Sequence, residues 1–258
     1  METTFMRAEA SSPSAAAGGA GGMFDFSHVK RDTQQHLTRV YGALTAAAGA
    51  AAVGAYSYDV VLDGMFSGFW LLFLGSLFCV YQLKSSHCND INQPTSRWLY
   101  LLGFGFLTGV SIGPLLDLVA FIDPSIPTTA LVMTTLVFAT FTMMALQAPS
   151  RTWLYLGGIL GSMMLVSLTM AIVNIFLGSI ILFQAELMLG MLIFSGFVVF
   201  DTQVIITKHE LGDRDYLSHA LDLFVDAAAL FKRILVLLAQ NKARRSDESG
   251  SRRNTKRR

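Results

Sequence analysis

The stretch that decides the fold is Leu182–Asp201, which reads LFQAELMLGMLIFSGFVVFD. Before its closing aspartate it carries a single charged residue, Glu186. About 20 mostly apolar residues in a helix are enough to cross the ~30 Å hydrocarbon core of a bilayer. The stretch therefore predicts a membrane-spanning helix.

Five other runs have the same length and apolar character: Val40–Tyr58, Met65–Leu83, Trp98–Leu118, Thr128–Gln147 and Trp153–Phe176. A seventh segment, Tyr216–Gln240, is long enough but carries four charged residues, so it is only semi-polar. The whole chain is 14% charged, against roughly 25% in soluble domains. These observations exclude an ordinary soluble enzyme and predict an all-α membrane protein. We expect a flexible cytosolic segment at residues 1–34, a transmembrane domain at 35–240 and a basic cytosolic tail at 241–258.

The distribution of Lys and Arg predicts how the spans are oriented, because these residues resist translocation across the membrane. They occur before the first span and in the second, fourth and sixth connections, and none occurs in the first, third or fifth. The N-terminus and the even-numbered loops are therefore predicted to be cytosolic. A complete seventh crossing would carry the basic tail to the opposite side, whereas a re-entrant seventh helix would keep it in the cytosol. We predict a cytosolic tail.

Three aspartates lie where an apolar environment is expected. Asp201 ends the sixth span, and Asp222 and Asp226 share one helical face of the seventh segment, with His219 on the preceding turn. If the sixth helix continues about five to seven residues past Asp201 and the seventh begins near Tyr216, Asp201 lies roughly 8–10 Å and Asp226 about 15 Å from the hairpin turn. A tilt between the helices would close this gap. We predict that they face each other.

Two neighbouring carboxylates in a poorly hydrated site would share a proton. Protonated, the pair would hold the two helices together, and ionised it would repel or admit a hard cation such as calcium. Asp201 and Asp226 are thus the predicted pH-sensing gate and the candidate calcium ligands. Two simpler interpretations remain open: Asp201 is hydrated at the membrane edge, and Asp222 only pairs with a Lys or Arg.

Two common catalytic motifs are absent from the sequence. It contains no Walker loop and no His-Glu-x-x-His, and none of its five histidines lies in the first six spans. A zinc hydrolase needs three converging ligands, and only His209 and His219 are expected near the aspartates. We therefore predict that the protein is not an enzyme, has no cofactor and does not bind nucleic acid.

Several blocks occur in a characteristic order along the chain: QHLTRVY at 35–41, LTGVSIGP at 107–114, DPSI at 123–126, LYLGG at 154–158, DTQ at 201–203, LGDRDY at 211–216 and LDLFVD at 221–226. Over about Gln35–Asn241 the sequence resembles the Bax inhibitor-1 family, and within it the plant-type members. The resemblance implies a seven-helix bundle in the endoplasmic-reticulum membrane with the last helix at its centre. It also implies a pH-sensitive calcium leak and suppression of programmed cell death and stress signalling.

The resemblance further implies roles for individual residues. The paired gating aspartates of the family correspond to Asp201 and Asp226, and a basic group that accompanies them in some bacterial relatives corresponds most nearly to Lys84. Plant members have a basic C-terminal segment that binds calmodulin, and such targets mix apolar anchors with cations. The matching residues here are Phe231, Lys232, Arg233, Lys242, Arg244 and Arg245. Contact with anionic lipid is the alternative for the same residues.

Two classes of function follow. The first is a proton-gated calcium leak in the endoplasmic-reticulum membrane. The second is a non-conducting scaffold that binds cell-death or lipid-modifying membrane proteins. A heptahelical receptor would place its N-terminus outside the cytosol, opposite to the orientation predicted here.

Overall fold

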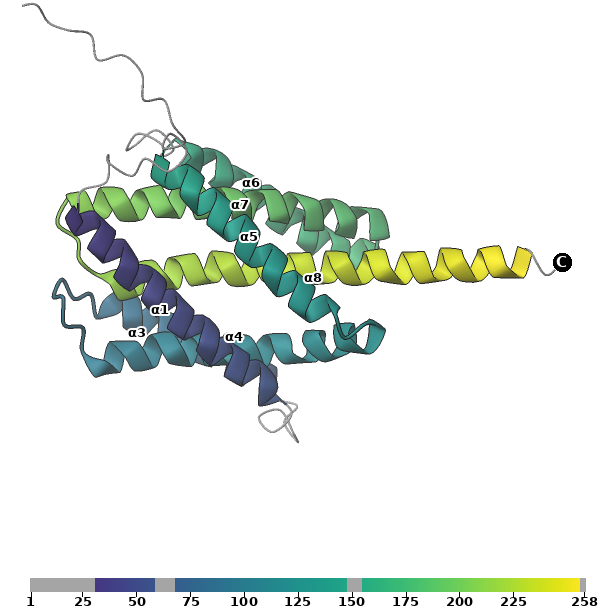
Figure 1. The fold of residues 1–258 in the computed structure, drawn as a ribbon, viewed down its shortest axis with the longest axis horizontal. Helices are drawn as coiled ribbons and strands as arrows, with labels where there is room; N and C mark the ends of the chain where they lie inside the picture. Colours follow the sequence, from purple (N-terminus) through teal and green to yellow (C-terminus); the bar gives the residue numbers. More distant parts are fainter. Residues whose placement is uncertain (1–30, 59–67, 148–154, 256–258) are drawn as a thin grey trace, which may run out of the picture.

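The structure is a computed structural model that describes residues 31–58, 68–147 and 155–255 (Figure 1). In these ranges all regular secondary structure is helical, and there are seven helices. They are α1 (Arg31–Tyr56), α3 (Gly68–Ser85), α4 (Thr95–Ile122), α5 (Ile126–Gln147), α6 (Leu156–Leu177), α7 (Ile180–Glu210) and α8 (Tyr216–Thr255). The predicted all-α class is confirmed. Most of the predicted N-terminal segment, residues 1–30, lies outside the described residues.

Helices α4, α5, α6 and α7 are each long and apolar enough to cross a membrane, and α3 contains a shorter apolar helix, Trp70–Ser85. Large apolar side chains point outward from these helices. Phe176 and Ile181, for example, are 84% and 79% exposed. A soluble monomer does not display so much apolar surface. The chain is a multi-pass membrane protein whose outer face is suited to lipid.

Several helices extend beyond the apolar runs that predicted them. Helix α1 begins at Arg31, ahead of Val40, so it includes the end of the segment predicted to be flexible. Helix α7 continues past Asp201 to Glu210, and α8 continues through most of the predicted tail to Thr255. The reason is physical: hydropathy marks only the part of a helix that lies in hydrocarbon. Polar helix formers extend the same helix into water.

Helix α8 lies at the centre of the bundle and runs along its whole length (Figure 1). It packs against α1, α3, α4, α5 and α7. Its leucines are almost completely buried, with Leu217, Leu223 and Leu230 each 0% exposed. The expectation of a semi-polar last helix at the centre is confirmed, and its apolar face accounts for its position.

Helices α1 and α4 approach closely at small residues. A Cβ atom placed on Gly105 or Gly109 would lie 2.5 or 1.9 Å from the carbonyl oxygen of Ala47 or Ala51 on α1. A side chain at either position would therefore force the two backbones apart. Such small-residue contacts replace the hydrophobic effect as a source of helix association inside membranes.

The end of α8 reaches the connection between α4 and α5. There Lys242 Nζ lies 2.6 Å from Asp123 Oδ2, and the hydrogen bond from Lys242 holds the pKa of Asp123 below its ordinary value. Helix α8 thus passes from one end of the bundle to the other. The start of the basic tail lies at the end opposite to the α7–α8 connection. The predictions that the sixth connection and the tail are both cytosolic therefore exclude each other, and the side of the membrane on which each end lies stays a prediction.

Candidate functional site

Asp201 and Asp226 come from the two antiparallel arms of the α7–α8 hairpin. Asp201 lies nine residues before the end of α7 at Glu210, and Asp226 lies ten residues after the start of α8 at Tyr216. At 1.5 Å per residue these positions are about 14 and 15 Å from the hairpin turn. The two aspartates are therefore level, because α7 continues further past Asp201 than the sequence predicted.

The side chains of Asp201 and Asp226 are neighbours that interact with each other. Asp226 is 4% exposed, and its Oδ2 atom is buried without a hydrogen-bond partner. Among the described residues, no Lys, Arg or His side chain forms an ion pair with either aspartate. The site consists of two acids in contact, with one carboxyl oxygen unused.

Lys84 and Asp222 form a separate ion pair one turn closer to the hairpin turn. Lys84 Nζ lies 2.8 Å from both carboxyl oxygens of Asp222, and the two side chains are 41% and 35% exposed. Lys84 therefore forms its ion pair with Asp222 and not with Asp201 or Asp226. Asp222 thus has the cation partner that the simpler interpretation expected, and whether it has a further role stays a prediction.

Next to the turn, Arg97 and Asp215 form a buried ion pair that the sequence did not reveal. Arg97 Nη1 and Nη2 donate to the two carboxyl oxygens of Asp215 at 2.8 and 2.7 Å. Arg97 is 2% exposed and Asp215 0%. Burial alone would raise the pKa of Asp215, but hydrogen bonds from Arg97 and Ser218 outweigh it and lower that pKa. Asp215 is thus a fixed carboxylate that holds the start of α8 against α4.

Three histidines from three helices meet beside this pair. His36 Nε2 on α1 lies 3.0 Å from His219 Nδ1 on α8, and the rings of His36 and His209 stack at 4.3 Å. His219 is therefore in a histidine cluster and not at the aspartate pair. Sequence reasoning left out His36, because 183 residues separate it from His219. Within the described ranges, no group of three or more His, Cys, Asp or Glu side chains is arranged to hold a metal ion.

Toward the other end of the bundle, Arg233 points into the bundle from α8. Its Nη2 lies 3.4 Å from Glu186 Oε1 on α7, and its guanidinium carbon lies 4.5 Å from the ring centre of Phe194. Gly190 makes room for it, since a Cβ there would lie 2.0 Å from Arg233 Nε. Arg233 is therefore engaged inside the bundle, in a segment predicted to bind calmodulin or lipid.

The other residues of that predicted segment divide into two groups. Phe231 packs against the buried cluster that includes Ile234 and Leu235. Lys232, Lys242, Arg244 and Arg245 are exposed, although Lys242 is paired with Asp123. The cations available to a partner at this end are thus mainly those that follow Gln240.

Comparison with known proteins agrees with this architecture. A family model described as "Inhibitor of apoptosis-promoting Bax1" matches residues 33–243. The chain belongs to the Bax inhibitor-1 family. A protein named Bax inhibitor 1 from Bos taurus is 44% identical over 223 residues, which cover 85% of this chain and 92% of the relative.

Plant proteins that are also named Bax inhibitor 1 are similar to this chain. The protein from Oryza sativa subsp. japonica is 36% identical over 250 residues, 96% of this chain and 97% of its own length. The protein from Arabidopsis thaliana is 40% identical over 232 residues, 89% and 91% of the two chains. The range matched by the Bax inhibitor-1 family model contains Asp201, Asp226, Arg97 and Asp215, and it ends at Ala243.

Proposed function

We propose that the protein suppresses programmed cell death in the endoplasmic-reticulum membrane by acting as a pH-sensitive calcium leak, gated by Asp201 and Asp226. The family description "Inhibitor of apoptosis-promoting Bax1" and the relatives' name, Bax inhibitor 1, support suppression of cell death. The proposed activity is transport, with calcium as the permeant ion and no chemical step.

One observation supports the gating mechanism: the side chains of Asp201 and Asp226 interact with each other, and no described cation forms an ion pair with either. A hydrogen bond between two carboxyl groups needs a proton on one of them, because a carboxylate can only accept. The protonated pair joins α7 to α8. When the proton leaves, attraction is replaced by repulsion between two charges in a poorly hydrated place.

The same charges would favour a divalent cation once the helices separate. Carboxylate oxygens are preferred calcium ligands, although calcium takes six to eight oxygens in all. Two aspartates can supply only part of that shell, and water would supply the rest. Such incomplete coordination suits an ion that passes through better than one that stays bound.

The experiment is calcium efflux from liposomes that contain the purified chain, measured between roughly pH 5 and 8, where we expect the shared proton to be released. Asp226→Asn keeps the size and supplies a permanent donor, so the response of flux to pH should flatten. Asp226→Arg should pair with ionised Asp201 and keep the leak closed throughout this range.

Asp222→Asn is the matched control, because Asp222 lies one turn away on the same helix and already has a partner in Lys84. It should retain most of the pH response. If both Asp226 variants conducted like wild type while Asp222→Asn lost its pH response, Asp222 would be the gate. Absence of flux from every form, wild type included, would favour the non-conducting scaffold.

We propose calmodulin as a partner of the basic tail, through Lys242, Arg244, Arg245 and the cations that follow. The exposure of Lys242, Arg244 and Arg245 supports this choice, whereas Phe231 and Arg233 are held in the bundle. A chain that ends at Gln240 should lose calcium-dependent binding to immobilised calmodulin and keep its bundle. Equal binding by the full and shortened chains would remove the tail from this role.

A further inference from the structure

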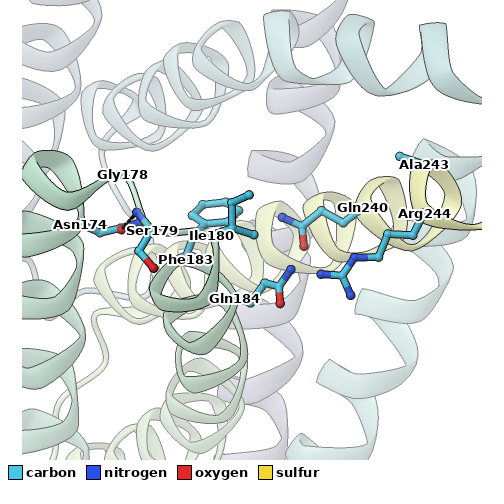
Figure 2. Close-up of a pocket in the computed structure, with 9 residues that line it drawn as sticks. All are labelled: Asn174, Gly178, Ser179, Ile180, Phe183, Gln184, Gln240, Ala243 and Arg244. Atoms are coloured by element: carbon cyan, nitrogen blue, oxygen red, sulfur yellow. Dashed lines mark hydrogen bonds between the residues drawn. The ribbon is translucent and has the colours of Figure 1, made fainter. Parts of the chain in front are cut away.

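A cavity of about 510 Å³ opens where α6 turns into α7 and the far part of α8 passes beside them. It is lined by Asn174, Gly178, Ser179, Ile180, Phe183, Gln184, Gln240, Ala243 and Arg244 (Figure 2). Gln240 follows Asp226 by 14 residues on one helix, which is about 21 Å. The cavity is therefore separate from the aspartate pair.

Three hydrogen-bond donors converge on this cavity. Figure 2 shows the side-chain amides of Gln184 and Gln240 and the guanidinium of Arg244 directed toward one another across it. None of the three forms a hydrogen bond or ion pair with another described residue. Asn174 differs, because its Oδ1 accepts a hydrogen bond from Ser179 N at 2.8 Å. The cavity thus holds a cation and two amides with unused donors, and none of its nine lining residues is acidic.

Phosphate fits this set of donors. Its oxygens accept several hydrogen bonds at once, and an arginine guanidinium binds two of them in parallel. A calcium ion does not fit, because Arg244 would repel it and no carboxylate is present to bind it.

The surroundings indicate which molecule carries the phosphate. Ile180 and Phe183 line the cavity itself, and Phe176, Ile180 and Ile181 are 84%, 72% and 79% exposed beside it. Helices α6 and α7 both qualify as membrane spans, so the turn between them lies at the level of the lipid headgroups. A soluble phosphate would use the donors alone, whereas a phospholipid would use the apolar surface as well.

We propose that this cavity binds the headgroup of an anionic phospholipid, with Arg244, Gln184 and Gln240 holding the phosphate. Ile180 and Phe183 contact the glycerol and the upper acyl chains. Basic pockets between transmembrane helices bind lipid headgroups in this way. This lipid site lies at the end of the bundle away from the aspartate pair and does not depend on whether the protein conducts calcium.

The test is native mass spectrometry of the full chain in detergent, titrated with phosphatidic acid. Wild type should retain one phosphatidic acid more tightly than any further copies. Arg244→Gln should weaken this first binding about tenfold, as expected for loss of roughly one charge-assisted contact. Arg245→Gln is the matched control, since it removes an equal charge from the neighbouring residue, which does not line the cavity. It should leave the first binding within about twofold of wild type.

Gln184→Leu provides a second variant on another helix and should also weaken the first binding, so the outcome does not depend on Arg244 alone. If Arg244→Gln and Arg245→Gln weakened binding of the first phosphatidic acid equally, the proposed site would be wrong, and the lipid would be attracted to the charge of the tail in general. Phosphatidylcholine that binds as tightly as phosphatidic acid would overturn the requirement for an anionic headgroup. Inorganic phosphate that displaces phosphatidic acid at equal concentration would overturn the lipid assignment.

Discussion

Two buried aspartates of the α7–α8 hairpin have opposite surroundings. Asp215 is 0% exposed and receives two hydrogen bonds from Arg97, at 2.8 and 2.7 Å, and one from Ser218 Oγ at 2.8 Å. Asp226 is 4% exposed and meets another acid, Asp201. A buried carboxylate whose charge is compensated by a cation and by hydrogen bonds stays ionised and keeps its contacts. A buried acid without a cation changes its interactions when its proton leaves, so the comparison separates an anchor from a switch.

The largest effect on stability should come from removing the cation that pairs with Asp215, which leaves Asp215, like Asp226, without an ion pair. Arg97→Met leaves a buried carboxylate without its cation, and we expect the free energy of unfolding to fall by about 3–5 kcal/mol. Thermal and denaturant unfolding in mixed micelles measure this loss. Combining Arg97→Met with Asp215→Asn should recover much of it, because no charge is then stranded. If the free energy of unfolding of Arg97→Met alone were within about 1 kcal/mol of the wild-type value, Arg97 would not be an anchor.

The same isosteric change at the two aspartates should have unequal consequences. Asp215→Asn leaves the buried guanidinium of Arg97 without its carboxylate and should cost about 3–5 kcal/mol. Asp226→Asn loses no ion pair with any described cation, so at neutral pH the stability should stay the same or rise. Unfolding of both variants in the same micelles checks the contrast. Similar losses at the two positions would mean that Asp226 is also an anchor.

Acid should act on the anchor in a defined direction. The pKa of Asp215 is lowered in the fold, with Arg97 and Ser218 overcoming the opposing effect of burial. Its stabilisation is therefore complete above the unfolded value of about 3.9 and is lost as pH falls below that value through the folded pKa. Melting temperatures measured from pH 6 to 3 should decline less steeply for Asp215→Asn than for wild type. Parallel curves would refute this assignment.

The smallest effect should come from the exposed ion pair. Lys84 and Asp222 are 41% and 35% exposed, and pairs of this kind contribute about 0–1 kcal/mol. Lys84→Met should therefore change the free energy of unfolding by no more than this. Lys208→Met, which removes an exposed cation that pairs with no described acid, serves as the control. A loss as large as that in Arg97→Met would show that exposure does not set the strength of these pairs.

The contact between Asp201 and Asp226 was predictable because it depends on local arithmetic. Two helices joined by a short turn place residues at equal distances from the turn side by side. Hydropathy locates the apolar part of both helices, but α7 continues further past Asp201 than hydropathy predicted. The pairing of Asp222 with a cation could be expected, but its partner Lys84 could not be named.

Contacts between distant parts of the chain were not predictable in this way. Arg97 and Asp215 are 118 residues apart, and in the sequence Arg97 is only one more cytosolic cation. His36 lies near the start of a helix, ahead of the predicted span, and nothing in its neighbours indicates that α7 and α8 surround it. Which helices are adjacent depends on packing in three dimensions, whereas hydropathy reports only which segments enter the membrane.

The meeting of His36 with His219 has a consequence for biosynthesis. The two histidines are 183 residues apart, and a ribosome adding about 5–20 residues per second needs roughly 10–40 s to make that length. During this time α1 has left the ribosome, but α8, which will cover its polar end, does not yet exist. The polar end of α1 is therefore among the last parts of the described bundle to reach its final neighbours, although α4 can pack against the rest of α1 earlier, and assembly is completed only after α8 emerges.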